Sequence, residues 1–388
     1  MTLTEAFDRV RLSPLGRYQS AVVRIAVAGS WLLFLLREWP HRAELYGPDG
    51  PMSFDMAQRR VAENDAFTVL LWSRGETWFE LVYTLAMLAS LALMLGWRTR
   101  AASVLFMIGV LSLQNRNSYV GDGGDNVFHL MAIYLVATRC GQVWSLDSRR
   151  SRLRGAGPDV AGVALWVLLA AGFVATLSFG LLSWGWALVF GGLLAVHAVW
   201  SLARRYAPGE PRGVCDQVAN LVHNGALLVI VGQLCVLYAS AGWYKIQGGR
   251  WQDGTAAYYP MQVEAFTPWP VLSDLVSSQA FPILLMTYGT VLVQVAFPFS
   301  LLNRRAKNVL LALLIAEHAG IAILLGLPFF SLAVIAADLI FLPTSLLLRV
   351  EEKVSRWRRR KWRRLAAEQN DPDPAAREPE PEREPART

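Results

Sequence analysis

The stretch that decides the fold class is VANLVHNGALLVIVGQLCVLYAS, residues 218–240, followed directly by AGWYKIQGGRW, residues 241–251. The first part contains no Asp, Glu, Lys or Arg and is close to the ~20 apolar residues that a helix needs to cross the hydrocarbon core of a membrane. The second part places Lys245 among tryptophan, tyrosine and glycine residues, as is typical of the boundary between membrane and water. The two parts together predict a membrane-spanning helix that ends near Lys245.

Similar apolar segments recur along the whole 388-residue chain. Hydrophobic residues make up 54% of the chain and charged residues only 17%, compared with about 25% in soluble domains. We identify ten segments: 19–36, 77–95, 101–115, 125–138, 160–178, 183–202, 218–240, 280–302, 308–325 and 328–348. The third, fourth and ninth are short or interrupted by polar residues, so the pattern allows eight to ten spans. The sequence therefore predicts an all-α, polytopic helical membrane protein with about ten transmembrane helices.

The formal charge of +7 comes mainly from arginines, and their placement argues against a nucleic-acid partner. With ten spans, most arginines fall on the side of both termini, including the cluster at 349–364, whereas the opposite side holds few. Such asymmetry across short loops marks the arginine-rich side as cytoplasmic. We therefore expect a multi-pass protein of the plasma membrane with both termini in the cytoplasm.

The chain divides into a long membrane part and a short polar end. We expect one helical transmembrane domain over 1–348, in which the almost purely apolar pair at 160–202 has the character of an insertion. Residues 349–366 form a basic helix with two tryptophans that is suited to anionic lipid headgroups. Residues 367–388 are rich in Pro, Glu and Arg and are predicted to be a disordered cytoplasmic tail.

Lys245 is an unusual choice of cation in this chain, which contains only four lysines. The other three lie in the expected cytoplasmic flanks, whereas Lys245 lies at the extracytoplasmic end of a span. Unlike arginine, a desolvated lysine can lose its proton and act as a base, and Trp243, Tyr244 and Trp251 are candidates for an apolar wall around it. The other interpretation is a lysine that anchors the helix at the interface.

A second polar set lies in QNRNSYVGDGGDNVFHL, residues 114–130, between the third and fourth spans. Its candidate site residues are Asn115, Asn117, Asp125, Asn126 and His129. Asp125 and His129 are four residues apart, so on a helix they share a face and can pair. So much polarity at the ends of two spans indicates either a solvated loop or the lining of a pocket on the same side as Lys245.

A third set consists of ionisable residues inside the last two spans. Glu317 and His318 lie in the ninth span and Asp338 lies in the tenth. Such residues are functional candidates by default, although they also serve as structural pairs. His223, near the start of the seventh span, is predicted to be structural. The cysteines have no metal-ligand spacing, and no metal site is expected.

Three motifs resemble those of the HTTM (horizontally transferred transmembrane) family, which is related to the membrane domain of vitamin K-dependent gamma-carboxylase. The first is NRNSYVGDGGDNVFHL, residues 115–130, followed by WSLD at 144–147. The second is YASAGWYKIQGGRWQDGTAAYY, residues 238–259, and it is similar to the family's AG-x-x-K-L and W-x-x-G pattern. The third is EHAGIAILLGLPFFSLAVIAADLIFLP, residues 317–343. The resemblance covers about 15–348, apart from the pair at 160–202.

The resemblance implies a role for Lys245 as a base acting with reduced vitamin K or menaquinol. In the carboxylases, a lysine at this place serves the oxygenation of the hydroquinone, which yields a base able to deprotonate a glutamate γ-carbon. The carboxylases carry a histidine where this chain has Asn117, which forms hydrogen bonds but does not exchange protons. They also carry a large domain after the membrane part, whereas this chain continues for about 40 residues, so a protein substrate held by such a domain is not expected.

Two hypotheses of function follow. The first is a quinol-linked oxygenase or carboxylase-like membrane enzyme with Lys245 as base. In it, Asn117, His129 and His318 are further candidate catalytic residues. The candidate substrate-binding residues are Trp243, Tyr244, Trp251, Asn115, Asp125, Asn126 and Glu317. The second is a non-catalytic membrane protein that assists the maturation or export of a secreted peptide, as small family members are thought to do.

Overall fold

The computed structural model describes residues 2–153 and 160–369, with side chains over 2–152 and 160–361. Helices make up 81% of the described residues, and no strand occurs among them. The expected all-α class is therefore confirmed. Contacts divide the chain into a first unit, Met1–Leu342, and a second unit, Pro343–Thr388.

The apolar segments of the sequence become helices whose ends agree with the expected spans to within a few residues, apart from the longest. They are α2 (Arg17–Glu38), α5 (Glu76–Leu95), α6 (Thr99–Arg116), α7 (Gly123–Ala137), α9 (Val160–Ser178), α10 (Trp184–Tyr206), α11 (Glu210–Gln247), α14 (Ala280–Ser300) and α15 (Arg304–Leu324). The exception is α11, which begins well before the expected span 218–240. Its first two turns contain charged residues and precede the apolar segment, and the whole helix has 38 residues.

Fewer helices than expected are long and apolar enough to cross a membrane. Seven helices in the described residues meet that description, and an eighth does if Pro328–Phe341 and Thr344–Lys361 count as one bent span. The expected third and fourth spans do not: α7 has only 15 residues, and α6 carries Arg100, Gln114, Asn115 and Arg116 within its 18. Both helices nevertheless contribute many buried residues to the bundle, including Phe106 and Val110 of α6 and Phe128 and Met131 of α7.

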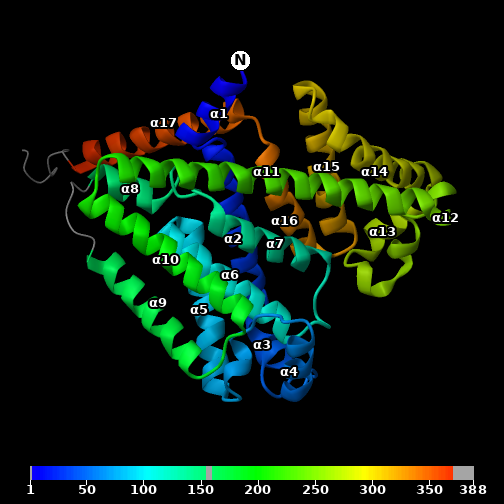
Figure 1. Cartoon of the computed structure of the whole chain (residues 1–388). Coiled ribbons are helices and arrows are strands. Elements are labelled where there is room, and N and C mark those ends of the chain that lie inside the picture. The colour runs from blue at the N-terminus through cyan, green and yellow to red at the C-terminus, as the bar shows by residue number, and fades with distance from the viewer. Residues whose placement is uncertain (1, 154–159, 370–388) are drawn as a thin grey trace, which may run out of the picture. The chain divides into compact units, whose positions relative to one another are not determined.

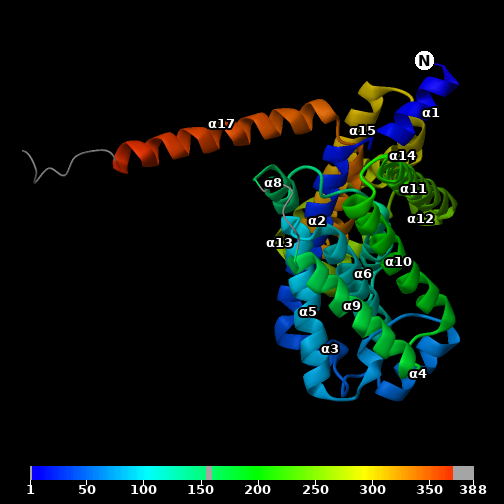
Figure 2. The ribbon, with the colours of Figure 1, turned by 60° about the vertical axis from the view of Figure 1, so that its left-hand side comes forward.

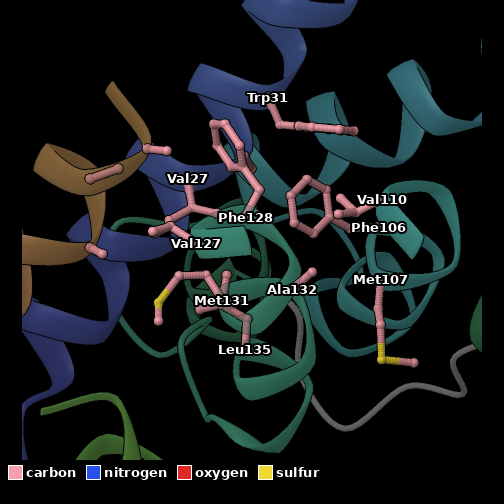
Figure 3. Packing of buried hydrophobic residues seen from close by; sticks show 14 of the residues in the cluster. Val27, Trp31, Phe106, Met107, Val110, Val127, Phe128, Met131, Ala132 and Leu135 are labelled. Atoms are coloured by element: carbon pink, nitrogen blue, oxygen red, sulfur yellow. The ribbon is translucent and has the colours of Figure 1, made fainter. Parts of the chain in front are cut away.

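The core of the first unit lies between α2, α5, α6, α7 and α16 (Pro328–Asp338). Figure 3 shows its centre, where Trp31 of α2 faces Phe128 of α7, with a ring-centroid distance of 5.1 Å. Phe106 and Val110 of α6 close the other side of the cluster. Inside a bilayer, such a cluster stabilises the bundle through close van der Waals packing and not through removal of apolar surface from water.

The N-terminal helix α1 (Leu3–Leu12) is fastened to α11 by the polar residues near the start of that helix. Asn224 donates to the carbonyl oxygens of Val10 and Ser13 at 2.7 and 3.0 Å. His223 Nδ1 accepts from the Arg139 amide at 2.9 Å, and its Nε2 donates to the carbonyl oxygen of Leu15 at 2.8 Å. His223 is therefore structural, as predicted.

The connection between the first two spans folds into short helices at one end of α5 and α6. These are α3 (Arg42–Tyr46), α4 (Phe54–Glu63), and the 3-10 turns η1 (Trp39–His41) and η2 (Leu70–Trp72). Both Figure 1 and Figure 2 show α3 and α4 at this end and α1 at the opposite end of the first unit. In Figure 1, α11 crosses α2 instead of running parallel to it, and it ends at α12 (Gly249–Gln252).

Helices α9 and α10 form a hairpin with little burial. Fig. 1 and Fig. 2 show them side by side, and none of the spanning window of α9 is buried. The Phe67 ring contacts those of Trp186 and Phe190 of α10 in tilted arrangements, at 5.1 and 5.0 Å between ring centroids. Most of this apolar surface is therefore left for lipid, consistent with the lipid-facing pair expected at 160–202.

The end of the chain differs from the expected span at 328–348. Helix α16 ends at Asp338, a 3-10 turn η5 (Leu339–Phe341) follows, and α17 (Thr344–Gln369) begins after Pro343. Leu342 is extended, with φ −61° and ψ 137°, because a residue before proline is disfavoured in the helical conformation. The expected basic helix 349–366 lies within α17, and residues 370–388 of the expected tail lie outside the described residues.

Candidate functional site

Lys245 lies at the end of α11 and is held by a chain of hydrogen bonds to α14 and α15. Its Nζ donates to Gln294 Oε1 at 2.9 Å, and Gln294 Nε2 donates to Glu317 Oε1 at 2.6 Å. Gln294 is only 5% exposed. The amine and the carboxylate therefore interact through a buried amide and not directly.

Gly242 explains how α11 and α14 come close enough for this contact. A Cβ atom at Gly242 would lie 2.6 Å from the Cγ2 atom of Val295, and Val295 is the residue that follows Gln294 on α14. Only glycine permits this approach, and Lys245 follows less than one turn later. The glycine of the AGWYK stretch thus positions the lysine against its partner.

His318 lies beside Glu317 on α15 and has an unusual environment. The residue is 4% exposed, and neither Nδ1 nor Nε2 has a hydrogen-bond partner among the described residues. The ring of Phe330 on α16 lies 5.6 Å away between centroids. Buried polar groups are nearly always hydrogen-bonded, so these two nitrogens are available to a polar group from outside the chain.

Tyr238 of α11 and Asp338 of α16 form a second buried polar pair. The Tyr238 hydroxyl donates to Asp338 Oδ2 at 2.6 Å, and Asp338 Oδ1 has no partner in the part of the chain that the structure describes. Tyr238 precedes Lys245 by two helical turns on one face of α11, a rise of about 10 Å. The polar groups of α11 therefore extend from Lys245, at the end of the helix, to Tyr238 further inside the span.

Of the aromatic residues expected to wall Lys245, one does so and two do not. The Trp251 ring lies 5.3 Å from Lys245 Nζ, in a cation–π arrangement. Trp243 and Tyr244 are 62% and 74% exposed, so neither is buried against the amine. Outside the span, the Thr255 hydroxyl and the more distant Arg250 hold the pKa of Asp253 below its usual range, so this carboxylate is ionised near the site.

Asn115, Arg116 and Asn117 hold the α3–α4 connection in place. Asn117 Nδ2 donates to the carbonyl oxygen of Leu45 at 2.8 Å, and Asn115 Nδ2 donates to that of Phe67 at 2.9 Å. Arg116, 2% exposed, donates to the carbonyl oxygens of Met52 and Gly47 at 2.8 and 2.5 Å. These side chains are committed to backbone groups.

Asp125 and His129 do not pair with each other. Asp125 accepts from the Asp122 amide at 2.7 Å in a capping box that starts α7, whereas His129 Nδ1 lies 3.0 Å from Gln114 Oε1. The helix start competes for the Asp125 carboxylate, because its free amide groups attract a negative charge. Asn126 is exposed.

The structure brings together Lys245, Glu317 and His318, but it separates them from Asn115 and Asn117. The first group lies toward α12, and the second is bonded to the α3–α4 connection, which is at another part of the unit in Figures 1 and 2. Phe330 connects the surroundings of His318 with the start of α7. Its ring lies beside that of His318, and its backbone packs against Gly124 in the first turn of α7.

Sequence reasoning missed Gln294, Tyr238 and Arg24. Gln294 and Tyr238 carry no charge, so only a polar side chain within a span could have signalled them. Arg24 was detectable as a charge inside the first span. It is fully buried and donates to the carbonyl oxygens of Leu93, Met94, Cys140 and Trp144 at 2.5, 2.9, 3.2 and 2.7 Å.

Two surface clefts lie elsewhere. One, of about 620 Å³, lies between the ends of α2, α8 (Leu146–Leu153) and α11 and includes Arg17, Arg139 and Asp216. The other, of about 360 Å³, is apolar and is formed by Trp269 and α13 (Pro270–Ser277). No group of three or more His, Cys, Asp or Glu that could hold a metal occurs among the described residues.

Comparison with known proteins leaves the chain without an assigned relative. No family model, no curated protein and no solved structure matches it. What the structure establishes is a helical protein with the architecture of a multi-pass membrane protein.

Proposed function

We propose that the chain is a member of the HTTM family and a quinol-dependent membrane enzyme in which Lys245 is the base. The proposal is carried by one observation: the Lys245 amine is linked through buried Gln294 to Glu317, beside the two unpartnered nitrogens of His318. An interfacial anchor needs only water or headgroups around its ammonium, and such a set of buried partners is costly without a function.

The available groups fit a quinol, which has polar hydroxyls on an apolar ring. A bound quinol would supply reducing equivalents, and dioxygen would accept them. Lys245 Nζ would take the proton of one hydroxyl, and His318 would form a hydrogen bond to a polar edge of the ring. Trp251 beside Lys245 would keep water from the amine, because an apolar wall favours the uncharged form.

The proposal includes the plasma membrane as the site of action, with the Lys245 end of α11 on the extracytoplasmic side. Support comes from the placement of the arginines, which marks the side of both termini as cytoplasmic. Reduced vitamin K or menaquinol, which reside in the lipid phase, would then reach the site from the bilayer.

We expect Lys245→Ala to abolish quinol oxidation and Lys245→Arg not to restore it, because arginine keeps its proton. The measurement is quinol-dependent oxygen consumption by the purified protein in lipid nanodiscs. Lys353→Ala, an exposed lysine on α17, serves as the matched control and should retain activity. Activity in Lys245→Arg would show that only the charge matters, and the base role would be lost.

A second candidate is assistance to the maturation or export of a secreted peptide. It is favoured by the apolar cleft at α13, where Val271 is 84% and Leu275 60% exposed. In that case Val271→Asp with Leu275→Asp should block peptide maturation, whereas Lys245→Ala should not. The opposite result would favour the enzyme.

A further inference from the structure

Gln294 can both donate and accept at the end of its side chain without gaining or losing a proton, whereas an ammonium only donates and a carboxylate only accepts. In the recorded orientation, Lys245 Nζ donates to Oε1 and Nε2 donates to Glu317 Oε1. This orientation suits an ammonium and a carboxylate. If the amide turned over, Nε2 would donate to the lone pair of a free amine and Oε1 would accept from a protonated Glu317.

Both arrangements keep the two hydrogen bonds that join Gln294 to Lys245 and to Glu317, and both have a net charge of zero. The mixed arrangements leave one uncompensated charge inside a span, which is costly. The proton count at Lys245 is therefore tied to that at Glu317. Coupled groups of this kind titrate as a pair.

The charged and titratable groups facing this pair come from four elements. Glu317 and His318 lie on α15, Asp338 on α16 and its partner Tyr238 on α11. On α12, Arg250 is engaged with Asp253 at 3.7 Å and with the ring of Tyr259 at 4.4 Å. Among these groups, Glu317 is the carboxylate that is joined to Lys245 through Gln294.

We propose that Gln294 is a two-state bridge whose amide orientation selects whether Lys245 is an ammonium or a free amine. When Lys245 becomes the free amine, its Nζ–H bond breaks and an O–H bond forms on Glu317, so the proton that leaves the amine is the one that the carboxylate gains. One proton moves and no electron does. The use of the free amine as a base rests on the proposed function, but the bridge itself does not.

The test measures the free amine directly by its reaction with an acylating ester, since only the uncharged amine is nucleophilic. The full-length protein in nanodiscs is labelled with a sulfonated N-hydroxysuccinimide acetate, and the four lysines are quantified by mass spectrometry. Lys353 and Lys361, both exposed, give the reference rate. Lys307, whose ammonium is bonded to the carbonyl oxygen of Phe341, reports unfolding if its labelling rises.

Two substitutions should move the Lys245 rate in opposite directions. Gln294→Glu places a carboxylate against the amine and should lower the rate at least tenfold, since an adjacent opposite charge shifts such an equilibrium by about 10- to 1,000-fold. Glu317→Gln removes the proton acceptor, so the ammonium becomes uncompensated and the rate should rise. An unchanged rate in either variant overturns the proposal.

The double variant Gln294→Glu/Glu317→Gln exchanges the acid and the amide while keeping one carboxylate. Because the carboxylate then contacts the amine without an amide between them, Lys245 should stay protected. A wild-type rate here would show that only the number of charges matters, and the bridge would be excluded. Since no quinol is present, this outcome is independent of whether the protein oxidises quinols.

Discussion

At the scale of single residues, burial and partners separate structural cations from the candidate base. Arg24 is fully buried and is surrounded by backbone carbonyl oxygens, whereas Lys245 is half-buried and meets one amide and one aromatic ring. Arginine has five donors in a fixed plane and can satisfy several carbonyls at once. Arginine therefore suits the carbonyl-lined position of residue 24, whereas lysine suits position 245, where the cation has few partners.

Arg24→Met is expected to destabilise the protein, because it leaves the carbonyl oxygens of Leu93, Met94, Cys140 and Trp144 without their donor. Each buried group left unpaired costs about 1–3 kcal/mol, so a loss of at least about 3 kcal/mol is expected. Thermal unfolding in detergent should show it as a fall of at least about 5 °C.

Arg17→Met is the matched control, since Arg17 is exposed at the start of the same helix. It should leave the unfolding temperature nearly unchanged. Equal losses in the two variants would contradict the role assigned to Arg24.

At the scale of elements, contacts from distant parts of the chain decide where helices start. Helix α6 begins at Thr99, and its first amide groups are capped by Asp147 from the WSLD stretch. Asp147 accepts from the amides of Arg98 and Thr99 at 3.0 and 2.7 Å and from the Thr99 hydroxyl at 2.7 Å. The motif that supports the family resemblance thus has a structural task here.

Asp147→Ala should cost about 1–2 kcal/mol of folding free energy, the usual effect of losing a helix cap. Asp147→Asn, which keeps an acceptor oxygen, should lose less. The free energies are compared by denaturant unfolding in detergent. Asp274→Ala on exposed α13 is the control, and a loss as large as that of Asp147→Ala would speak against a specific cap.

The basic helix α17 is expected to bind anionic lipid. A peptide of residues 344–366 should bind phosphatidylglycerol vesicles and only weakly bind phosphatidylcholine vesicles, since each cation near an anionic surface contributes about 1 kcal/mol. Tryptophan fluorescence measures the binding. Replacing Arg358, Arg359 and Arg360 by Gln should weaken it at least tenfold, and unchanged binding would rule out the charge mechanism.

At the scale of the whole molecule, the distribution of arginines between the two sides predicts how the protein is oriented in the membrane. The arginine asymmetry predicts that both termini are cytoplasmic. A fluorescent protein that folds only in the cytoplasm should therefore be bright when fused to either end, and alkaline phosphatase fused there should be inactive. One bright and one dark end would mean an odd number of spans.

The sequence by itself determined the helical class and most helix boundaries, because hydropathy and helix-ending residues act locally. The span expected at 280–302 is α14, Ala280–Ser300, and that at 160–178 is α9, Val160–Ser178. It also singled out Lys245, Glu317 and His318 as residues too polar for their surroundings. The partners of these residues were not readable from the sequence.

Only the tertiary structure decided which polar residues meet. Gln294 is 49 residues from Lys245 and 23 from Glu317, and no local pattern marks it as the residue between them. Asn117 and Lys245 were expected in one pocket, yet Asn117 is bonded to Leu45, 72 residues earlier. Hydropathy predicts which segments form helices within the membrane. The neighbours of each side chain depend on how one helix face packs against another, which the hydropathy of a single segment does not specify.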